Sequence, residues 1–253
     1  MDHQRLGSTG LQVSPIAFGA FKIGRNQGIK YPSAYQLPNQ ETANKLLNNV
    51  LDLGINLIDT APAYGVSEQR IGDAIAHRRD QYILATKIGE QFANGKSSYD
   101  FSMATLVSSI ETSLRLLKTE TVDLLHIHSD GNDMAILNET DAVEAINTFK
   151  TQGKARFIGF SGKTIEGALA SLEWADTLMV EYNQEQTEAR QLIDQAASQG
   201  VGVLVKKPLG SGHLEPQTAI EEGLSVPGVS TLVVGSLNAA HLEQNLQWAR
   251  AAH

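Results

Sequence analysis

The sequence contains no cysteine among its 253 residues. This absence excludes disulfide frameworks and thiolate catalysis, and it is compatible with a reducing compartment. Basic runs are absent as well, since the densest clusters are Arg78-Arg79 and Lys206-Lys207 and the formal net charge is −8. No nucleic-acid partner is expected, because binding to a phosphate backbone depends on clustered cations.

Long apolar segments are also missing. No stretch approaches the ~20 apolar residues that a membrane helix needs, so no membrane partner is expected. The opening residues, MDHQRLGSTG, lack the basic-then-apolar pattern of a signal peptide. We therefore expect a cytoplasmic protein, and the sequence leaves its oligomeric state open.

What the chain does contain is a regular alternation of short apolar runs and amphipathic segments. Hydrophobic residues make up 42% of the sequence and no linker divides it, which predicts one domain over residues 1–253. Thr42–Leu53 and Met103–Leu117 carry apolar residues at helical spacing. Eight runs have the character of strands: Ile16–Phe18, Ile55–Ile58, Tyr82–Thr86, Val122–Ile127, Arg156–Phe160, Thr177–Val180, Val201–Val205 and Val229–Val234.

This alternation predicts a parallel sheet with crossover helices. The length is close to the ~250 residues typical of a (β/α)8 TIM barrel. An open doubly wound sheet would be favoured by a GxGxxG turn after the first strand, but Gly19 and Gly24 are wrongly spaced for one. We therefore predict an α/β fold, a closed barrel whose bottom is plugged by a hairpin within Met1–Val13. The seventh helix, within Pro216–Glu222, is expected to be short.

Polar residues end three successive strand-like runs. Asp59, Lys87 and His128 are each in phase with the apolar positions before them, so alternation directs all three side chains into the barrel. They would lie at the carboxyl ends of the strands, where barrel enzymes carry their active sites. Asp59 would also supply the counter-charge that an ammonium in the interior requires.

Tyr64 lies shortly after Asp59, on a loop that rims the same end of the barrel. A phenol has an ordinary pKa of about 10, and the nearby ammonium of Lys87 is expected to lower it. Tyr64 could then act as a general acid toward a carbonyl oxygen that His128 orients. For any single residue, a structural ion pair or a packed aromatic ring is the simpler interpretation, but the convergence of four favours catalysis.

Motifs that cover nearly the whole chain resemble the aldo-keto reductases. They are LGSTGLQVSPIAFGAFKIG, DTAPAYGVSEQRIGDAI, ATKIG, VDLLHIHSD, GFSGKT, VEYN, KKPLGSGHL and VVGSLNAAHLEQN, in that family's order. The second resembles the signature around the family's catalytic Asp and Tyr. The resemblance implies an NAD(P)H-dependent oxidoreductase that reduces an aldehyde or ketone, a small-molecule carbonyl substrate, to an alcohol. In that enzyme Tyr64 is the proton donor, Asp59 and Lys87 tune it, and His128 orients the carbonyl.

The resemblance also implies a nicotinamide cofactor, with NADP(H) favoured by the family and NAD(H) possible. Many members carry basic residues where this chain has Gly235 and His241, and histidine holds a 2′-phosphate more weakly than arginine. The segment GSLNAAHLEQN opens a predicted helix whose first backbone amides favour a phosphate. The expected cofactor-binding residues are Ala20, Phe21, Asp59, Ser161, Gly162, Met179, Lys206, Lys207, Leu209, Ser211, Ser236, Asn238, His241, Gln244 and Asn245.

Three of these positions depart from the family's pattern. Gly162 stands where Asn is usual, Met179 where Gln is frequent, and Lys206 where an aromatic residue stacks on the nicotinamide ring. A cation at position 206 is expected to repel the oxidised ring more than the reduced one. The alternative is that Lys206 and Lys207 reach the pyrophosphate, beside backbone groups of Leu209 and Ser211. Strand alternation allows only one of Lys206 and Lys207 to point inward.

Two other functions stay open. His126 and His128, with Asp130 beyond them, are arranged like ligands of barrel metallohydrolases, although Lys87 beside a dication would be unfavourable. No metal is otherwise expected. The second alternative is a subunit that senses nicotinamide nucleotide with little turnover.

The substrate pocket is expected to be open and loosely selective. The family builds this pocket from long loops and a C-terminal extension, whereas the chain ends at His253, directly after the last predicted helix. The loop after His128 is also expected to be short, from Ser129 to about Asn138. The predicted lining residues are Phe21, Ile23, Tyr64 and Phe92.

Overall fold

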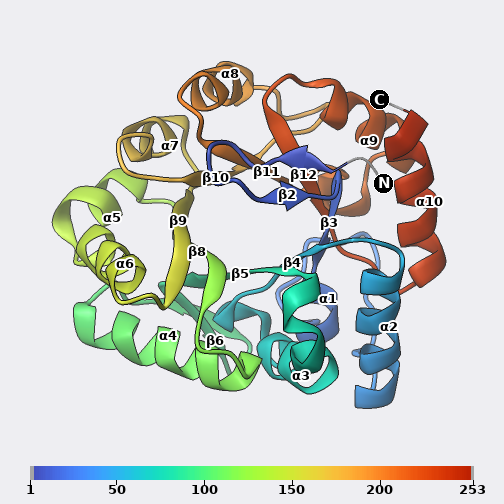
Figure 1. Ribbon diagram of the computed structural model, residues 1–253, viewed down its shortest axis with the longest axis horizontal. Helices are drawn as coiled ribbons and strands as arrows, with labels where there is room; N and C mark the ends of the chain where they lie inside the picture. Colours follow the sequence, from blue (N-terminus) through green and yellow to red (C-terminus); the bar gives the residue numbers. More distant parts are fainter. Residues whose placement is uncertain (1–2, 252–253) are drawn as a thin grey trace.

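Eight parallel strands form a closed barrel in the computed structural model, which describes residues 3–251 (Figure 1). Neighbouring strands follow the order β10-β11-β12-β3-β4-β5-β8-β9, so the sheet has no free edge. Each of the eight predicted strand-like runs coincides with one barrel strand, which confirms the TIM-barrel prediction. The strands are β3 (Ile16–Gly19), β4 (Leu57–Asp59), β5 (Ile83–Ile88), β8 (Val122–His128), β9 (Ala155–Ser161), β10 (Thr177–Glu181), β11 (Gly202–Lys206) and β12 (Val229–Val234).

Helices cover the outside of this barrel (Figure 1). Helix α2 shows how the sequence sets the ends of these helices. Asn39 caps the start of α2 by accepting a hydrogen bond from the backbone N of Thr42 at 2.8 Å. Gly54, with φ 86°, follows the end of α2. Within residues 3–251 the helices lack the length and apolar character that a bilayer-crossing segment requires. The helices are α1 (Phe21–Gly24), α2 (Gln40–Asp52), α3 (Ser67–Ile75), α4 (Met103–Leu117), α5 (Asp133–Glu139), α6 (Ala142–Thr151), α7 (Ile165–Ser171), α8 (Arg190–Ser198), α9 (Pro216–Ser225) and α10 (Ala239–Ala251), with short 3-10 turns η1 (Pro62–Tyr64), η2 (Ala76–Gln81) and η3 (Gly210–Gly212).

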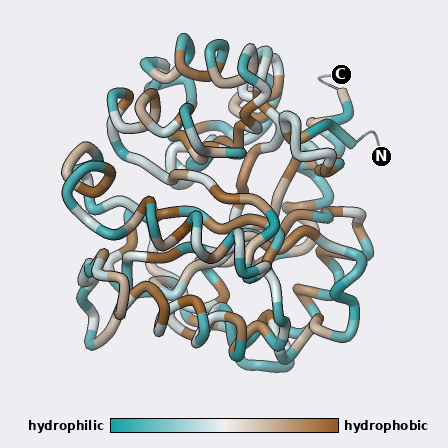
Figure 2. The backbone as a smooth tube through the Cα atoms, turned by 60° about the vertical axis from the view of Figure 1, so that its left-hand side comes forward, coloured by the Kyte–Doolittle hydropathy of each residue, from teal (hydrophilic) through white to brown (hydrophobic). Residues whose placement is uncertain are grey.

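Two apolar clusters hold the fold together, as alternation along buried strands requires. The larger one lies between the strands and the helices and includes the buried residues Leu47, Ile110 and Phe149. The smaller one fills the barrel interior and includes Leu57, Ala85, Leu124, Met179 and Leu204. Figure 2 shows the hydrophobic segments concentrated along the central strands.

A hairpin closes the barrel at the amino ends of the strands, as predicted. It pairs β1 (Gln4–Arg5) with β2 (Gln12–Val13) and crosses the front of the barrel in Figure 1. Leu6, between its strands, is fully buried against Gly202, where β11 begins. Some residues named in the predictions lie outside the described residues: Met1 and Asp2 of the hairpin segment, and His253 of the short C-terminus.

The predictions missed a second hairpin, which follows β5. Strands β6 (Glu90–Ala93) and β7 (Lys96–Tyr99) pair antiparallel around Asn94 and Gly95, whose φ angles are 52° and 77°. Asn-Gly is a favoured pair for such a turn, because both central residues need positive φ.

Two predictions of element length were wrong. The segment after His128, expected to be a short loop, contains helix α5. The seventh helix, α9, has ten residues because Glu215 caps its start and Pro216 occupies its first turn.

Candidate active site

Asp59 and Lys87 meet at the carboxyl ends of adjacent strands β4 and β5. Lys87 Nζ donates to Asp59 Oδ1 at 2.6 Å and to the carbonyl oxygen of Thr60 at 2.9 Å, and only 1% of the Lys87 side chain is exposed. Burial by itself lowers the pKa of Lys87, but the charges of Asp59 and Tyr64 outweigh it and hold that pKa above its ordinary value. Lys87 is therefore a buried ammonium with a fixed counter-ion.

Tyr64 closes the turn η1 over this pair. The Lys87 ammonium lies 4.9 Å from the centroid of the Tyr64 ring, and the ring of Phe21 packs edge-on against it at 5.1 Å. Gly65 follows with φ 62° against the backbone of Gly24, where a side chain would collide. Burial raises the pKa of Tyr64 to about 12, although Lys87 acts to lower it. The expected net lowering by Lys87 was therefore wrong: desolvation of the phenolate is the larger effect.

His128 ends β8 on the other side of Tyr64, with the two ring centroids 6.3 Å apart. Its Nδ1 lies 2.9 Å from Oε2 of Glu90, at an angle that does not make an aligned hydrogen bond. Burial lowers the pKa of His128 to about 4, and Glu90 opposes that change. The structure thus brings together all four predicted catalytic residues, and it adds Glu90, which the sequence interpretation missed.

Glu90 is itself held in place by its own partners. Ser97 Oγ on the neighbouring strand β7 donates to its Oε1 at 2.6 Å, and an Arg25 nitrogen lies 3.8 Å from the same oxygen. Burial raises the pKa of Glu90, but His128, Ser97 and Arg25 together lower it to about 2. Glu90 therefore carries a full negative charge beside His128.

His126 lies one layer deeper in the barrel, as predicted. It is fully buried, and its Nε2 is 3.0 Å from Oγ1 of Thr177. Burial lowers its pKa to about 3. Among the residues that the structure describes, no group of three or more acidic or histidine side chains is arranged to hold a metal ion.

A cavity of about 800 Å³ lies at the carboxyl ends of the strands, and its lining includes Asp59, Tyr64, Lys87, Glu90 and His128. Most expected cofactor residues line it together with the catalytic group: Phe21, Asp59, Ser161, Gly162, Met179, Lys206, Lys207, Leu209 and Ser211. The others do not line this cavity: Ala20, Ser236, Asn238, His241, Gln244 and Asn245. The last five are expected around the adenosine half of the cofactor, and that assignment stays a prediction. Gly235 alone of the GSLNAAHLEQN segment reaches the cavity.

The physical reasons for these exceptions differ. Ala20 is fully buried, with its backbone N bonded to the carbonyl oxygen of Asp59 at 2.8 Å. The Oγ of Ser236 accepts a hydrogen bond from the backbone N–H of Asn238 at 3.1 Å, so these two residues bond to each other within one loop. Two residues predicted to line the pocket do not line it. Ile23 lies in the hydrophobic core, and the Phe92 ring stacks on the Arg25 guanidinium, whose carbon is 3.6 Å from the ring centroid.

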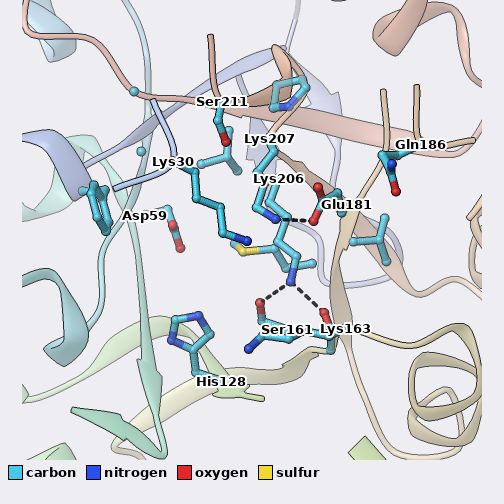
Figure 3. Close-up of a pocket in the computed structure, with 18 of the residues that line it drawn as sticks. Lys30, Asp59, His128, Ser161, Lys163, Glu181, Gln186, Lys206, Lys207 and Ser211 are labelled. Carbon is cyan, nitrogen blue, oxygen red and sulfur yellow. Dashed lines mark hydrogen bonds and ion pairs between the residues drawn. The ribbon is translucent and has the colours of Figure 1, made fainter. Parts of the chain in front are cut away.

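Both lysines at the end of β11, Lys206 and Lys207, line the cavity, contrary to the expectation that only one would point inward. Lys206 is in phase with the inward Leu204, and Lys207 lies beyond the strand with φ 52°, which breaks the alternation. Lys207 forms an ion pair with Glu181, whereas Lys206 reaches Ser161 and Gly162 (Figure 3).

Gly162 has a structural explanation as well. A Cβ at this position would lie 2.6 Å from the Phe160 ring and 2.8 Å from Oδ2 of Asp133, so no side chain fits. Asp133 instead accepts hydrogen bonds from the next two backbone amides, those of Lys163 and Thr164, at 2.8 and 2.7 Å.

Comparison with known proteins places this barrel in a family. Residues 15–224 match the Aldo/keto reductase family. A crystal structure from Pseudomonas aeruginosa assigned to the aldo-keto reductases superposes with a TM-score of 0.91 and 40% identity, covering 99% of this chain and 94% of that one.

Two curated relatives share a large part of the sequence. L-galactose dehydrogenase of Arabidopsis thaliana is 33% identical over 84% of this chain and 66% of its own length. 6-dehydroglucose reductase of Novosphingobium aromaticivorans is 28% identical over 88% of this chain and 74% of its own length. Against the first three curated relatives the chain spans about half to two thirds of their length. The family match and the shared barrel show that this chain belongs to the aldo/keto reductase family of oxidoreductases.

Proposed function

We propose that this protein reduces the carbonyl group of an aldehyde or ketone to an alcohol with a reduced nicotinamide cofactor. The proposal rests on one observation above all: Tyr64, a buried Lys87–Asp59 ion pair and His128 converge on one cavity. The family generally uses nicotinamide cofactors, which supports the same reaction.

The residues around the cavity fit a ligand that carries phosphate groups. Lys22 and Lys30 line it, and within residues 3–251 neither has a carboxylate at ion-pair distance. Lys30 extends toward the cavity centre in Figure 3. The volume is within the range of roughly 300–1,000 Å³ usual for ligand pockets. We propose that Lys22, Lys30 and Lys207 hold the cofactor phosphates and that Ser161 faces the nicotinamide.

The chemistry then divides among the four residues. A bound nicotinamide would supply a hydride to the carbonyl carbon, and the carbonyl oxygen must gain a proton. Tyr64 holds that proton, because a pKa of about 12 keeps its phenol protonated at neutral pH. The Lys87 ammonium stabilises the negative charge that develops on the phenol oxygen, and Asp59 keeps Lys87 charged and in place. His128 orients the carbonyl oxygen.

For the substrate the proposal names a class of compounds, and for the cofactor it names two forms in order of preference. Both curated relatives described above have names that refer to sugars, so polyhydroxylated carbonyl compounds belong in the first substrate panel beside simple aldehydes. NADP(H) is proposed ahead of NAD(H) on the family's pattern. The single-domain organisation and the cytoplasmic location stay predictions.

Replacing Tyr64 by Phe tests the mechanism. The hydroxyl is lost while the ring packing against Phe21 is kept, so we expect turnover to fall by roughly 100-fold or more, with cofactor binding retained. The measurement is the loss of reduced-cofactor absorbance with the substrate panel, using both NADPH and NADH.

Tyr82→Phe is the matched control, because the Tyr82 hydroxyl is buried away from the cavity. Unchanged turnover in Tyr64→Phe would refute the mechanism. Cofactor binding without turnover across the panel would favour the sensing subunit, and chelator-sensitive hydrolysis would favour the metal alternative.

A further inference from the structure

Lys206 lines the same cavity as Tyr64 and His128. Its Nζ donates to Ser161 Oγ at 3.1 Å and to the carbonyl oxygen of Gly162 at 2.7 Å (Figure 3). Both partners are neutral, and within residues 3–251 no carboxylate lies at ion-pair distance from this ammonium. Lys206 therefore differs from Lys87 and Lys207, which are paired with Asp59 and Glu181.

The charges around Lys206 come from several elements. Burial, together with the charges of Lys207 and Lys87, lowers the pKa of Lys206, while Glu181 and Asp133 act to raise it; the net result is a pKa of about 7. Lys206 in turn acts on Asp59, His126 and His128. At neutral pH a substantial fraction of Lys206 is charged, without a counter-ion in contact.

The position of the reacting groups brings a nicotinamide ring close to this lysine. This step rests on the proposed function. A hydride donor must approach to about 3–3.5 Å of a carbonyl carbon whose oxygen contacts Tyr64 and His128. The cavity that contains Tyr64 and His128 has Met179, Ser161 and Lys206 in its lining, so a ring in that position would contact or displace the Lys206 ammonium.

We propose that Lys206 makes the cofactor site discriminate between the two redox states of the nicotinamide, binding the reduced form more tightly than the oxidised form. The oxidised ring carries a positive charge and the reduced ring does not, while both forms carry the same phosphates. A cation beside the ring therefore weakens binding of the oxidised form alone. This favours carbonyl reduction and release of the spent cofactor.

The decisive quantity is the ratio of the dissociation constants of oxidised and reduced cofactor, measured by calorimetry on the full chain without substrate. Below about pH 6 nearly all of Lys206 is charged. There we expect the ratio to be at least about tenfold in the wild type, because two like charges a few ångströms apart in a partly buried site interact by more than the ~1.4 kcal/mol of a tenfold change. Lys206→Met should bring the ratio close to one, and Lys206→Arg should retain it. Lys30→Met, which removes another cavity-facing charge, should weaken both forms equally.

A second measurement uses the unmodified protein. The ratio should fall as the pH rises through about 7, because Lys206 loses its charge there, and Lys206→Met should not show this change. If the wild type and Lys206→Met have the same ratio at every pH, the inference is overturned while the proposed function stands. If neither cofactor form binds the wild type, both fail.

Discussion

At the scale of single residues, the charge of Glu90 bears most directly on the catalytic group. The carboxylate reaches His128 from the hairpin after β5, and Ser97 and Arg25 hold it there. A carboxylate beside Nδ1 favours a proton on that nitrogen, so Nε2 of the neutral ring is an acceptor. The protonated ring, which the charge of Glu90 also favours, can donate from Nε2 to the substrate oxygen. We therefore expect Glu90 to act as a positioning residue, through His128.

Replacing Glu90 by Gln should lower the pKa of His128 below its present value of about 4. The variant loses a negative charge 2.9 Å from Nδ1, and a nearby opposite charge shifts a pKa by roughly 1 unit or more. NMR titration of the His128 ring in both proteins measures the change. Glu139→Gln, an exposed change at the end of α5, is the control. An equal His128 pKa in wild type and Glu90→Gln would contradict the positioning role.

At the scale of secondary-structure elements, Asp133 joins α5 to the loop between β9 and α7. Its carboxylate is buried and accepts hydrogen bonds from Ser129 Oγ, the backbone N of Lys163 and both the backbone N and Oγ1 of Thr164. The same carboxylate leaves no room for a side chain at Gly162. The position of Gly162 at the cavity therefore depends on a contact between α5 and a loop that is far from it in the sequence.

Asp133→Asn should reduce the free energy of unfolding by about 1–3 kcal/mol. An amide has one acceptor oxygen where the carboxylate has two, so either Ser129 Oγ or the backbone N–H groups of Lys163 and Thr164 must face an NH2 group. Urea denaturation measures the loss. Asp130→Asn is the control on the same loop, because Asp130 is partly exposed and should change stability by less than about 1 kcal/mol. Equal stability of Asp133→Asn and the wild type would refute this role.

At the scale of the whole molecule, charge is distributed unevenly. The chain has a formal net charge of −8, yet its main cavity is lined by more basic than acidic side chains. The basic ones are Lys22, Arg25, Lys30, Lys87, Lys163, Lys206 and Lys207, and the acidic ones are Asp59, Glu90, Glu181 and Glu188. Such an arrangement attracts an anionic ligand to the cavity while the rest of the surface repels it.

The stability of the whole fold should also depend on pH through Glu68. This side chain is buried between α3, β5 and α4, where it accepts hydrogen bonds from Thr86 Oγ1 at 2.6 Å and Ser113 Oγ at 3.1 Å. Burial raises its pKa from 4.5 to about 7, so the folded protein favours the neutral acid. The stabilisation is complete below the unfolded pKa and is lost as the pH rises through about 7.

Glu68→Gln should remove this dependence, because an amide stays neutral. As the pH rises from 4.5 to above 7, the free energy of unfolding of the variant should increase relative to that of the wild type by up to about 3 kcal/mol. Urea denaturation of both proteins across this range gives the difference and cancels the opposite trend from buried His126. Glu144→Gln on the exposed side of α6 is the control. A constant difference across the range would contradict the prediction.

The sequence by itself determined the barrel and the place of the candidate active site. Strand positions and side-chain phase are local properties of the chain, so alternation was enough to place Asp59, Lys87 and His128 at one end of the barrel. The pair Asn94-Gly95 also indicates a tight turn, so the second hairpin could have been predicted from the sequence.

Only the tertiary structure decided what surrounds that centre. The contact of Glu90 with His128, the neutral partners of Lys206 and the raised pKa of Tyr64 each depend on distances between remote segments and on burial from water. Neither quantity has a local signature in the chain, because a desolvation energy belongs to the assembled site and not to any one stretch of residues.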